Sequence, residues 1–157
     1  MLAITITKES SATRMRMYAN VVKMVLQRAC TVVGCPKGAV SVIFIGDAKM
    51  LKLNREYRGK DKTTNVLAFP SEAPHPPLSR GEREIERMRE RVRDLGDIFI
   101  CLPEAKREAK KYDWTLRYEI ARLALHGFLH LLGYDHVKER EARKMELLEQ
   151  KILHKFT

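Results

Sequence analysis

The stretch HGFLHLLGYDH, residues 126–136, contains three histidines whose spacing predicts a metal site on a helix. Residues four apart leave the same face of a helix one turn apart, so His126 and His130 can share one ion. Gly133 stands where the helix is expected to end, because glycine readily takes the left-handed conformation that reverses the chain. The turn that follows can return His136 to the same ion. Three neutral imidazoles leave a tetrahedral zinc with one open position, as in catalytic zinc sites.

The spacing is that of the metzincin proteases, with one departure. Those enzymes carry a glutamate directly after the first histidine as general base, and this chain has Gly127 there. Peptide hydrolysis by the usual route therefore lacks its proton carrier. A metal ion could still lower the pKa of a bound water toward about 7 or polarise a phosphoryl oxygen. A substrate that brings its own nucleophile, such as the 2′-hydroxyl of RNA, needs less from the protein.

The rest of the chain predicts a single α+β domain over residues 1–157. Apolar runs rich in β-branched residues predict strands at 2–7, 40–45, 66–69 and 98–101. Apolar residues at helical spacing predict helices at 12–30, 48–57, 104–111, 114–132 and 139–154, with Asp47 as a candidate N-cap. Because strands and helices do not alternate strictly, we expect a small mixed sheet of about four strands flanked by helices.

A charged insertion at about residues 71–94 interrupts this pattern. Three prolines open it, and glutamates and arginines three apart follow, which is typical of an exposed helix. The segment lies between two motifs of the candidate site, so it could overhang the cleft. We favour the simpler interpretation, a loop and helix on the surface.

The net charge of +10 is unevenly distributed. Residues 1–70 hold 12 Lys and Arg against 4 Asp and Glu, a balance of +8. A basic surface attracts polyanions by counterion release, and RNA is the commonest such partner. The alternative is that the charge serves only solubility.

The sequence also restricts the compartment. No apolar run approaches the roughly 18–20 residues that span a bilayer, and the N-terminus lacks the pattern of a secretory signal. Three cysteines, Cys30, Cys35 and Cys101, are a sparse and odd set that fits a reducing compartment. We interpret all three as small buried hydrophobic residues and expect a cytoplasmic protein without membrane contact.

Three stretches together resemble the YbeY family, the metal-dependent endoribonucleases of ribosomal RNA maturation. The first is HGFLHLLGYDH; the second is LNREYRGKDKTTNVLAFP, residues 53–70; the third is LGDIFI, residues 95–100. MELLEQKIL, residues 145–153, is similar to the last helix of that family. The resemblance covers roughly residues 40–155, and the histidine motif is its most specific part.

The resemblance implies a three-layer fold with zinc held by His126, His130 and His136. It also implies that Arg58 is a functional residue at the mouth of the site, where a guanidinium can contact phosphate with two hydrogen bonds. His126 is a further catalytic candidate, although the sequence does not separate this role from metal binding. Lys60 and Lys62 would guide the RNA backbone. Three imidazoles would also accept nickel or copper.

The family resemblance implies an endoribonuclease specific for single-stranded ribosomal RNA. The implied roles are maturation of the small-subunit 3′ end and ribosome quality control, with ribosomal proteins and ribosome-associated GTPases as partners. Two alternatives remain. The protein could be a metal hydrolase of another substrate, such as a peptidase with a base from elsewhere. It could instead be a ribosome-assembly factor whose zinc only stabilises the fold.

Four positions in these motifs have roles that depend on the fold. The family often has aspartate and serine where this chain has Asn65 and Ala68, so contacts with the substrate will differ if either position lines the cleft. Asp97 is interpreted as a structural hydrogen-bonding residue rather than a base. Asp135 could orient a ligand histidine, cap the following helix or stabilise the turn, and the sequence does not choose among these roles.

Overall fold

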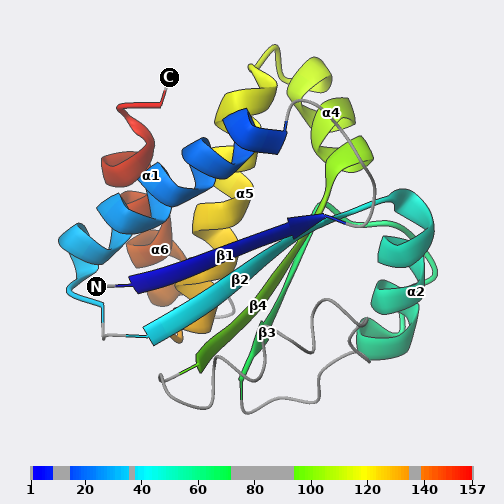
Figure 1. Ribbon diagram of the computed structural model, residues 1–157, viewed down its shortest axis with the longest axis horizontal. Helices are drawn as coiled ribbons and strands as arrows, with labels where there is room; N and C mark the ends of the chain where they lie inside the picture. The colour runs from blue at the N-terminus through cyan, green and yellow to red at the C-terminus, as the bar shows by residue number, and fades with distance from the viewer. Residues whose placement is uncertain (1, 9–14, 36–37, 72–93, 135–138, 157) are drawn as a thin grey trace.

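A four-stranded mixed sheet forms the centre of the protein in the computed structural model, which describes residues 2–8, 15–35, 38–71, 94–134 and 139–156 (Figure 1). The spatial order of the strands is β1-β2-β4-β3, with β1, β2 and β4 parallel and β3 antiparallel to β4. The strands are β1 (Leu2–Lys8), β2 (Gly38–Ile45), β3 (Val66–Pro70) and β4 (Asp94–Cys101). The helices are α1 (Met15–Val33), α2 (Asp47–Arg58), α4 (Leu102–Lys111), α5 (Leu116–Leu131) and α6 (Glu139–Leu153).

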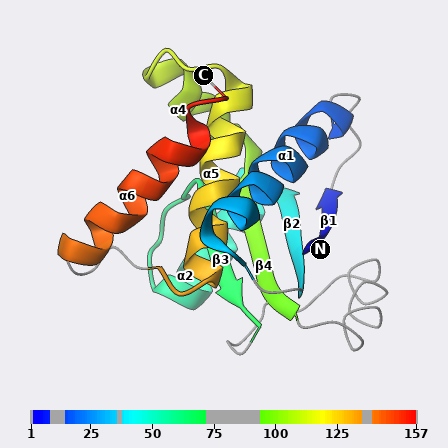
Figure 2. The ribbon, with the colours of Figure 1, turned by 90° about the vertical axis from the view of Figure 1, so that its left-hand side faces the viewer.

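The two central strands, β2 and β4, carry apolar side chains on both faces. Successive side chains of a strand point to opposite faces, so each strand supplies two separate cores. One core lies between the sheet and helices α1, α5 and α6, and includes Phe44 and Ile98. The other lies between the sheet and α2, and includes Ile45 and Phe99. Figure 2 shows α1, α5 and α6 together on one side of the sheet. The three-layer, α+β prediction is therefore confirmed.

The strands and helices predicted outside the charged insertion are all present in the described residues, but Asp47 is not the N-cap of its helix. The N-cap residue is Gly46, which is in an extended conformation. Glycine has no side chain, so the first turn receives no side-chain cap hydrogen bond. Asp47 is instead the first helical residue. Its carboxylate accepts hydrogen bonds from the Arg107 guanidinium of α4 at 2.6 and 3.1 Å. The charged insertion falls almost entirely on residues 72–93, which lie outside the described residues.

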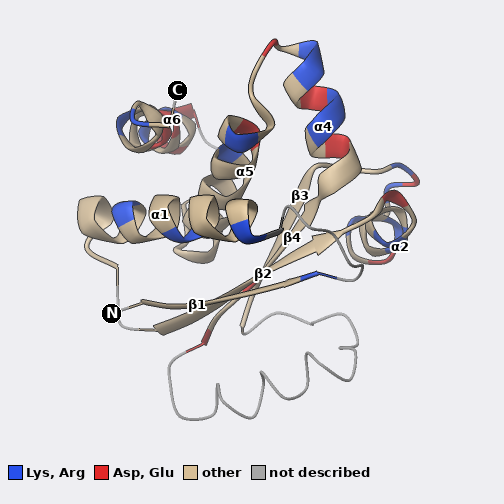
Figure 3. Cartoon of the chain, turned by 45° about the horizontal axis from the view of Figure 1, so that its top comes forward, with Lys and Arg blue, Asp and Glu red and all other residues tan. Residues whose placement is uncertain are grey.

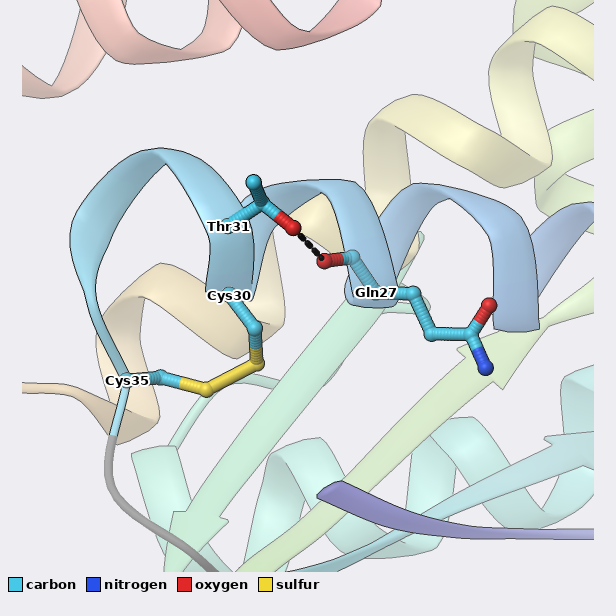
Figure 4. The surroundings of a disulfide bond; sticks show 4 residues. All are labelled: Gln27, Cys30, Thr31 and Cys35. Carbon is cyan, nitrogen blue, oxygen red and sulfur yellow. Dashed lines mark hydrogen bonds between the residues drawn. A yellow bond between two sulfur atoms is a disulfide. The ribbon is translucent and has the colours of Figure 1, made fainter. Parts of the chain in front are cut away.

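The interpretation of the cysteines is correct for Cys101 and wrong for the other two. Cys101 is buried and free, whereas Cys30 and Cys35 are half-buried and form a disulfide (Figure 4). Gly34 explains the pairing, because its φ of 68° ends α1 in a left-handed turn. The Cys35 amide then donates to the Cys30 carbonyl at 3.3 Å, and the two Cα atoms lie 4.7 Å apart, within disulfide range.

Within the described part of the chain, no helix combines the length and apolar character that crossing a bilayer requires.

Candidate active site

A pocket of about 730 Å³ lies between α5, strand β3 and the end of α2. It brings together three of the predicted site residues, Arg58, His126 and His130. Its other described lining residues are Tyr57, Thr64, Asn65, Val66, Leu67, Ala68, Phe69, Pro70, Gly127, Gly133 and Tyr134.

Helix α5 carries both histidines because local signals set its two ends. Thr115 caps its N-terminus by accepting a hydrogen bond from the Tyr118 amide at 3.1 Å. At the other end Gly133 has a φ of 88°, and the Tyr134 amide donates to the Leu129 carbonyl at 3.0 Å. The predicted helix stop at Gly133 is therefore confirmed.

The two histidines face each other across one turn of α5. Their Nε2 atoms lie 3.1 Å apart, and their rings are nearly perpendicular, with an interplanar angle of 76°. On the other side of the His126 ring, Nδ1 lies 2.8 Å from Oε1 of Glu149 on α6. The side chain of His126 is 29% exposed, so it is partly shielded yet accessible from the pocket.

This geometry fits two ligands of one zinc ion. Nitrogens that bind a tetrahedral zinc at about 2.0–2.1 Å lie roughly 3.3 Å from each other, close to the 3.1 Å between the two Nε2 atoms. Imidazole is also a preferred zinc ligand. The described residues alone contain no group of three side chains suited to hold a metal. The third predicted ligand, His136, and the turn residue Asp135 lie outside the described residues.

Arg58 reaches the pocket as the last residue of α2. Gly59 follows with a φ of 63° and turns the chain. The buried Asn54 side chain stabilises the loop that follows by donating a hydrogen bond to the Lys62 carbonyl at 2.6 Å. Arg58 is exposed. Lys60 and Lys62 are exposed on the same loop but do not line the pocket.

Charges of both signs are interleaved near this loop rather than gathered into one basic face. Figure 3 shows the alternation along α2 and α4. Arg55 pairs with Asp61 on the loop after α2, and Arg107 pairs with Asp47 and Glu104. Arg55 and Arg107 are therefore paired with carboxylates and neither lines the pocket, whereas Arg58 does, which makes Arg58 the more specific candidate for phosphate.

Gly127 packs against the sheet. A Cβ atom built at this position would lie 2.7 Å from Cγ2 of Ile98 and 3.4 Å from Cγ2 of Val66. Ile98 is fully buried and its Cγ2 branches directly from Cβ, so it cannot easily move aside. The position that carries the general base in metzincins is here a close helix–sheet contact, with no room for a glutamate.

Asn65 and Ala68, the two departures from the family pattern, both line the pocket. The Asn65 amide donates to Oε2 of Glu108 on α4 at 2.8 Å. Glu108 in turn lies 3.3 Å from Arg122 on α5. Asn65, directly before β3, is therefore linked to α4 and, through Glu108, to α5. This is a structural role, which the sequence did not indicate.

Beneath this link, Glu119 is a fully buried carboxylate on α5. It accepts two hydrogen bonds from the Arg122 guanidinium, at 2.7 and 2.8 Å. Burial raises the pKa of Glu119 above its ordinary value of 4.5, against the opposing effect of Arg122. Burial would lower the pKa of Arg122, but the hydrogen bond of Glu119 and the charges of Glu119, Glu108 and Glu149 raise it overall.

Asp97 stands in β4 opposite Phe69 of β3 and is only 1% exposed. It does not line the pocket, so a role as general base has no support from its position. The close approach of the two strands depends on the neighbouring Gly96, whose φ is 126° and where a Cβ would lie 2.1 Å from the Phe69 carbonyl oxygen.

Glu149 is the site residue that the sequence analysis missed. It lies one turn after Met145 and one turn before Ile152, both buried in the core. A carboxylate at this register of an amphipathic helix is unusual, because the same face packs against apolar side chains. A carboxylate on the apolar face of this helix was therefore the sequence signal that could have identified Glu149.

Comparison with known proteins agrees with the motifs. The family model "Endoribonuclease YbeY" matches residues 3–157. A protein named Endoribonuclease YbeY from Bacillus cereus strain G9842 is 40% identical over 140 residues, which cover 88% of this chain and 86% of that protein. Its counterpart from Bacillus cytotoxicus is 38% identical over 141 residues, with the same coverage.

The fold is shared more widely than the sequence. A solution structure of a protein from Thermotoga maritima aligns with a TM-score of 0.56 at 23% identity, covering 98% of this chain and 91% of that one. At this identity the match supports the fold alone. The family model and the two Bacillus relatives, together with the histidine motif, establish that the chain belongs to the YbeY family.

Proposed function

We propose that the protein is a metal-dependent endoribonuclease that cleaves single-stranded ribosomal RNA. The observation that carries this proposal is the shared pocket of Arg58, His126 and His130. Arg58 comes from α2 and both histidines come from α5, and their side-chain types are those that bind phosphate and a divalent metal. The names of the Bacillus relatives point to the same class of reaction.

His126 and His130 would hold the ion, with His136 as the third ligand. A zinc ion bound there supplies a Lewis acid for a phosphoryl oxygen or activates a water molecule near neutral pH. The remaining work falls to the chain itself. Arg58 would donate hydrogen bonds to the non-bridging oxygens of the scissile phosphate and stabilise the charge that develops there. Gly127 supplies no base, which favours a substrate with its own nucleophile, the 2′-hydroxyl.

The size and lining of the pocket support specificity for a single strand. A volume of about 730 Å³ is of a size that suits one or two nucleotides. Tyr57 and Tyr134 contribute aromatic surface to the lining, on which unpaired bases can stack. Lys60 and Lys62, exposed beside Arg58, would guide the RNA backbone toward the pocket.

The cellular role that we propose follows from this substrate. The enzyme would act in the cytoplasm on the 3′ end of small-subunit ribosomal RNA and in ribosome quality control. Ribosomal proteins and a ribosome-associated GTPase would be its partners. The support for these assignments is family membership.

Cleavage of a labelled single-stranded ribosomal RNA fragment tests the proposal. The protein is stripped of metal with a chelator and assayed before and after zinc is added. Arg58→Ala and His130→Ala are compared with Arg55→Ala, a matched control on the same helix whose partner is Asp61 and which does not line the pocket. We expect cleavage to require zinc, to disappear in His130→Ala, to fall 10²–10³-fold in Arg58→Ala and to persist in Arg55→Ala.

Two results would contradict the proposal. Equal cleavage by wild type and His130→Ala would indicate a contaminating nuclease. Binding of the RNA by the zinc-loaded protein without cleavage would favour the assembly-factor alternative. A duplex of the same sequence should resist cleavage; equal cutting of both forms would refute the single-strand specificity while leaving the nuclease in place.

A further inference from the structure

Glu149 contacts His126 on the side of the ring away from His130. Its Oε1 atom is 2.8 Å from His126 Nδ1, whereas His126 Nε2 is 3.1 Å from His130 Nε2. Nδ1 of the His126 ring therefore contacts Glu149 of α6, and Nε2 of the same ring contacts His130 of α5. The side chains of His126 and Glu149 are 29% and 20% exposed, so solvent screens their contact only in part.

The chemistry of the contact selects one tautomer. An ionised carboxylate can only accept hydrogen bonds, so Nδ1 must carry the proton that is shared with Glu149. A neutral ring protonated at Nδ1 keeps its lone pair on Nε2, the nitrogen that faces His130. We propose that Glu149 is a positioning residue, which holds His126 in the Nδ1–H tautomer and aims Nε2 at the metal. The metal part of this inference rests on the proposed function.

The packing of α6 places the carboxylate firmly. Met145 and Ile152, on the same face of α6 as Glu149, are 2% and 0% exposed in the core. Arg122 lies one turn before His126 on α5, and the negative charge of Glu149 is one of the influences that raise the pKa of Arg122. Glu149 thus contacts His126 of α5 while buried apolar residues of α6 anchor the helix on both sides of it. This arrangement matches the carboxylate–histidine–metal relationship that orients ligand rings in zinc sites.

Isosteric variants separate this role from simple bridging of two helices. Glu149→Gln keeps an oxygen that accepts from Nδ1, whereas Glu149→Met has a similar volume and no such acceptor. Glu146→Met, on an exposed position of the same helix, is the matched control. Zinc affinity is measured by competition with a chromophoric chelator, and thermal unfolding of the metal-free proteins confirms that each variant folds.

We expect Glu149→Met to weaken zinc binding roughly 10- to 100-fold. Glu149→Gln should show an intermediate loss, because the hydrogen bond survives without the charge, and Glu146→Met should bind as the wild type does. A bridging role alone would lower the unfolding temperature of Glu149→Met and leave its zinc affinity unchanged. That outcome would overturn the proposal.

The tautomer is tested separately on metal-free protein by ¹⁵N NMR of the imidazoles. His126 should carry its proton on Nδ1 in the wild type and in Glu149→Gln, and should shift toward the Nε2–H form in Glu149→Met. The same tautomer in all three proteins would overturn the inference. If the wild type binds no zinc, the proposed metal chemistry fails, but the NMR result still decides whether Glu149 orients His126.

Discussion

Gly127 of α5 and Ile98 of β4 are in such close contact that a Cβ at position 127 would lie 2.7 Å from Cγ2 of Ile98. Gly127 also lines the pocket, as His126 and His130 do. The glycine therefore lets α5 approach the sheet closely enough to hold His126 and His130 beside β3. A glutamate at this position would collide with Ile98, and its absence also leaves the site without a general base there.

We expect Gly127→Ala to lower the free energy of unfolding by about 1 kcal/mol. Overpacking of a buried site costs about 1–3 kcal/mol, and the gain in helix propensity from glycine to alanine offsets about 1 kcal/mol of it. Urea unfolding measures the change. The substitution should cost less in an Ile98→Ala background, because the clashing methyl group is gone; an equal cost in both backgrounds would argue against this contact.

Asn65→Asp would restore the residue common in the family, yet we expect it to destabilise this protein by about 1–2 kcal/mol. The Asn65 amide donates to Glu108 at 2.8 Å, and an aspartate would replace that hydrogen bond with two facing carboxylates. Denaturant unfolding at pH 7 measures the loss. Glu108→Gln should rescue the Asn65→Asp variant, and a double-mutant cycle without coupling would contradict the prediction.

The buried Glu119 should make stability fall as pH rises above 4.5. Its pKa is raised by burial, so between 4.5 and the raised value the folded protein binds a proton that the unfolded chain has released. The free energy of unfolding contributed by this group is therefore greatest at low pH and is lost as pH increases through the folded pKa. The free energy of unfolding, measured from pH 4.5 to 7.5, should depend less on pH in Glu119→Gln than in wild type. Glu141→Gln, on α6, serves as control, and parallel curves for Glu119→Gln and wild type would refute the assignment.

The disulfide between Cys30 and Cys35 predicts one reactive thiol in the unfolded, non-reduced chain and three after reduction. Closing so short a loop stabilises the folded state by about 2 kcal/mol in the chain-entropy model, so reduction should lower the free energy of unfolding by that amount. Thiol titration in denaturant gives the count. A Cys30→Ser, Cys35→Ser variant should match the reduced wild type; three reactive thiols without reductant would rule the disulfide out.

Local patterns were sufficient for most of the fold. The β-branched runs of β2 and β4 predicted strands, and the alternation of their side chains explains the two cores. The two errors were also local, but they involved glycines. Gly46 occupies the cap position expected for Asp47, and Gly34 turns the chain so that Cys30 and Cys35 meet. A spacing of five residues between cysteines matches no common motif, so only the turn revealed the pair.

Some residues of the candidate site were indicated by the sequence, and others were revealed only by tertiary packing. Family resemblance pointed to Arg58, and the structure places it on the pocket that His126 and His130 line. No motif pointed to Glu149, because its significance depends on how α6 packs against α5. Asn65 was recognised as a departure, but its partner Glu108 lies on another helix and could not be read from the chain.

The sequence by itself determined that His126 and His130 share one helix face and that the helix stops at Gly133. These features depend on the helical repeat and on the conformational freedom of glycine, which act over a few residues. Only the tertiary structure decided that Arg58 lines the same pocket as His126 and His130 and that Glu149 contacts His126. Such contacts arise when separate elements bury their apolar faces together, and that packing depends on the whole domain.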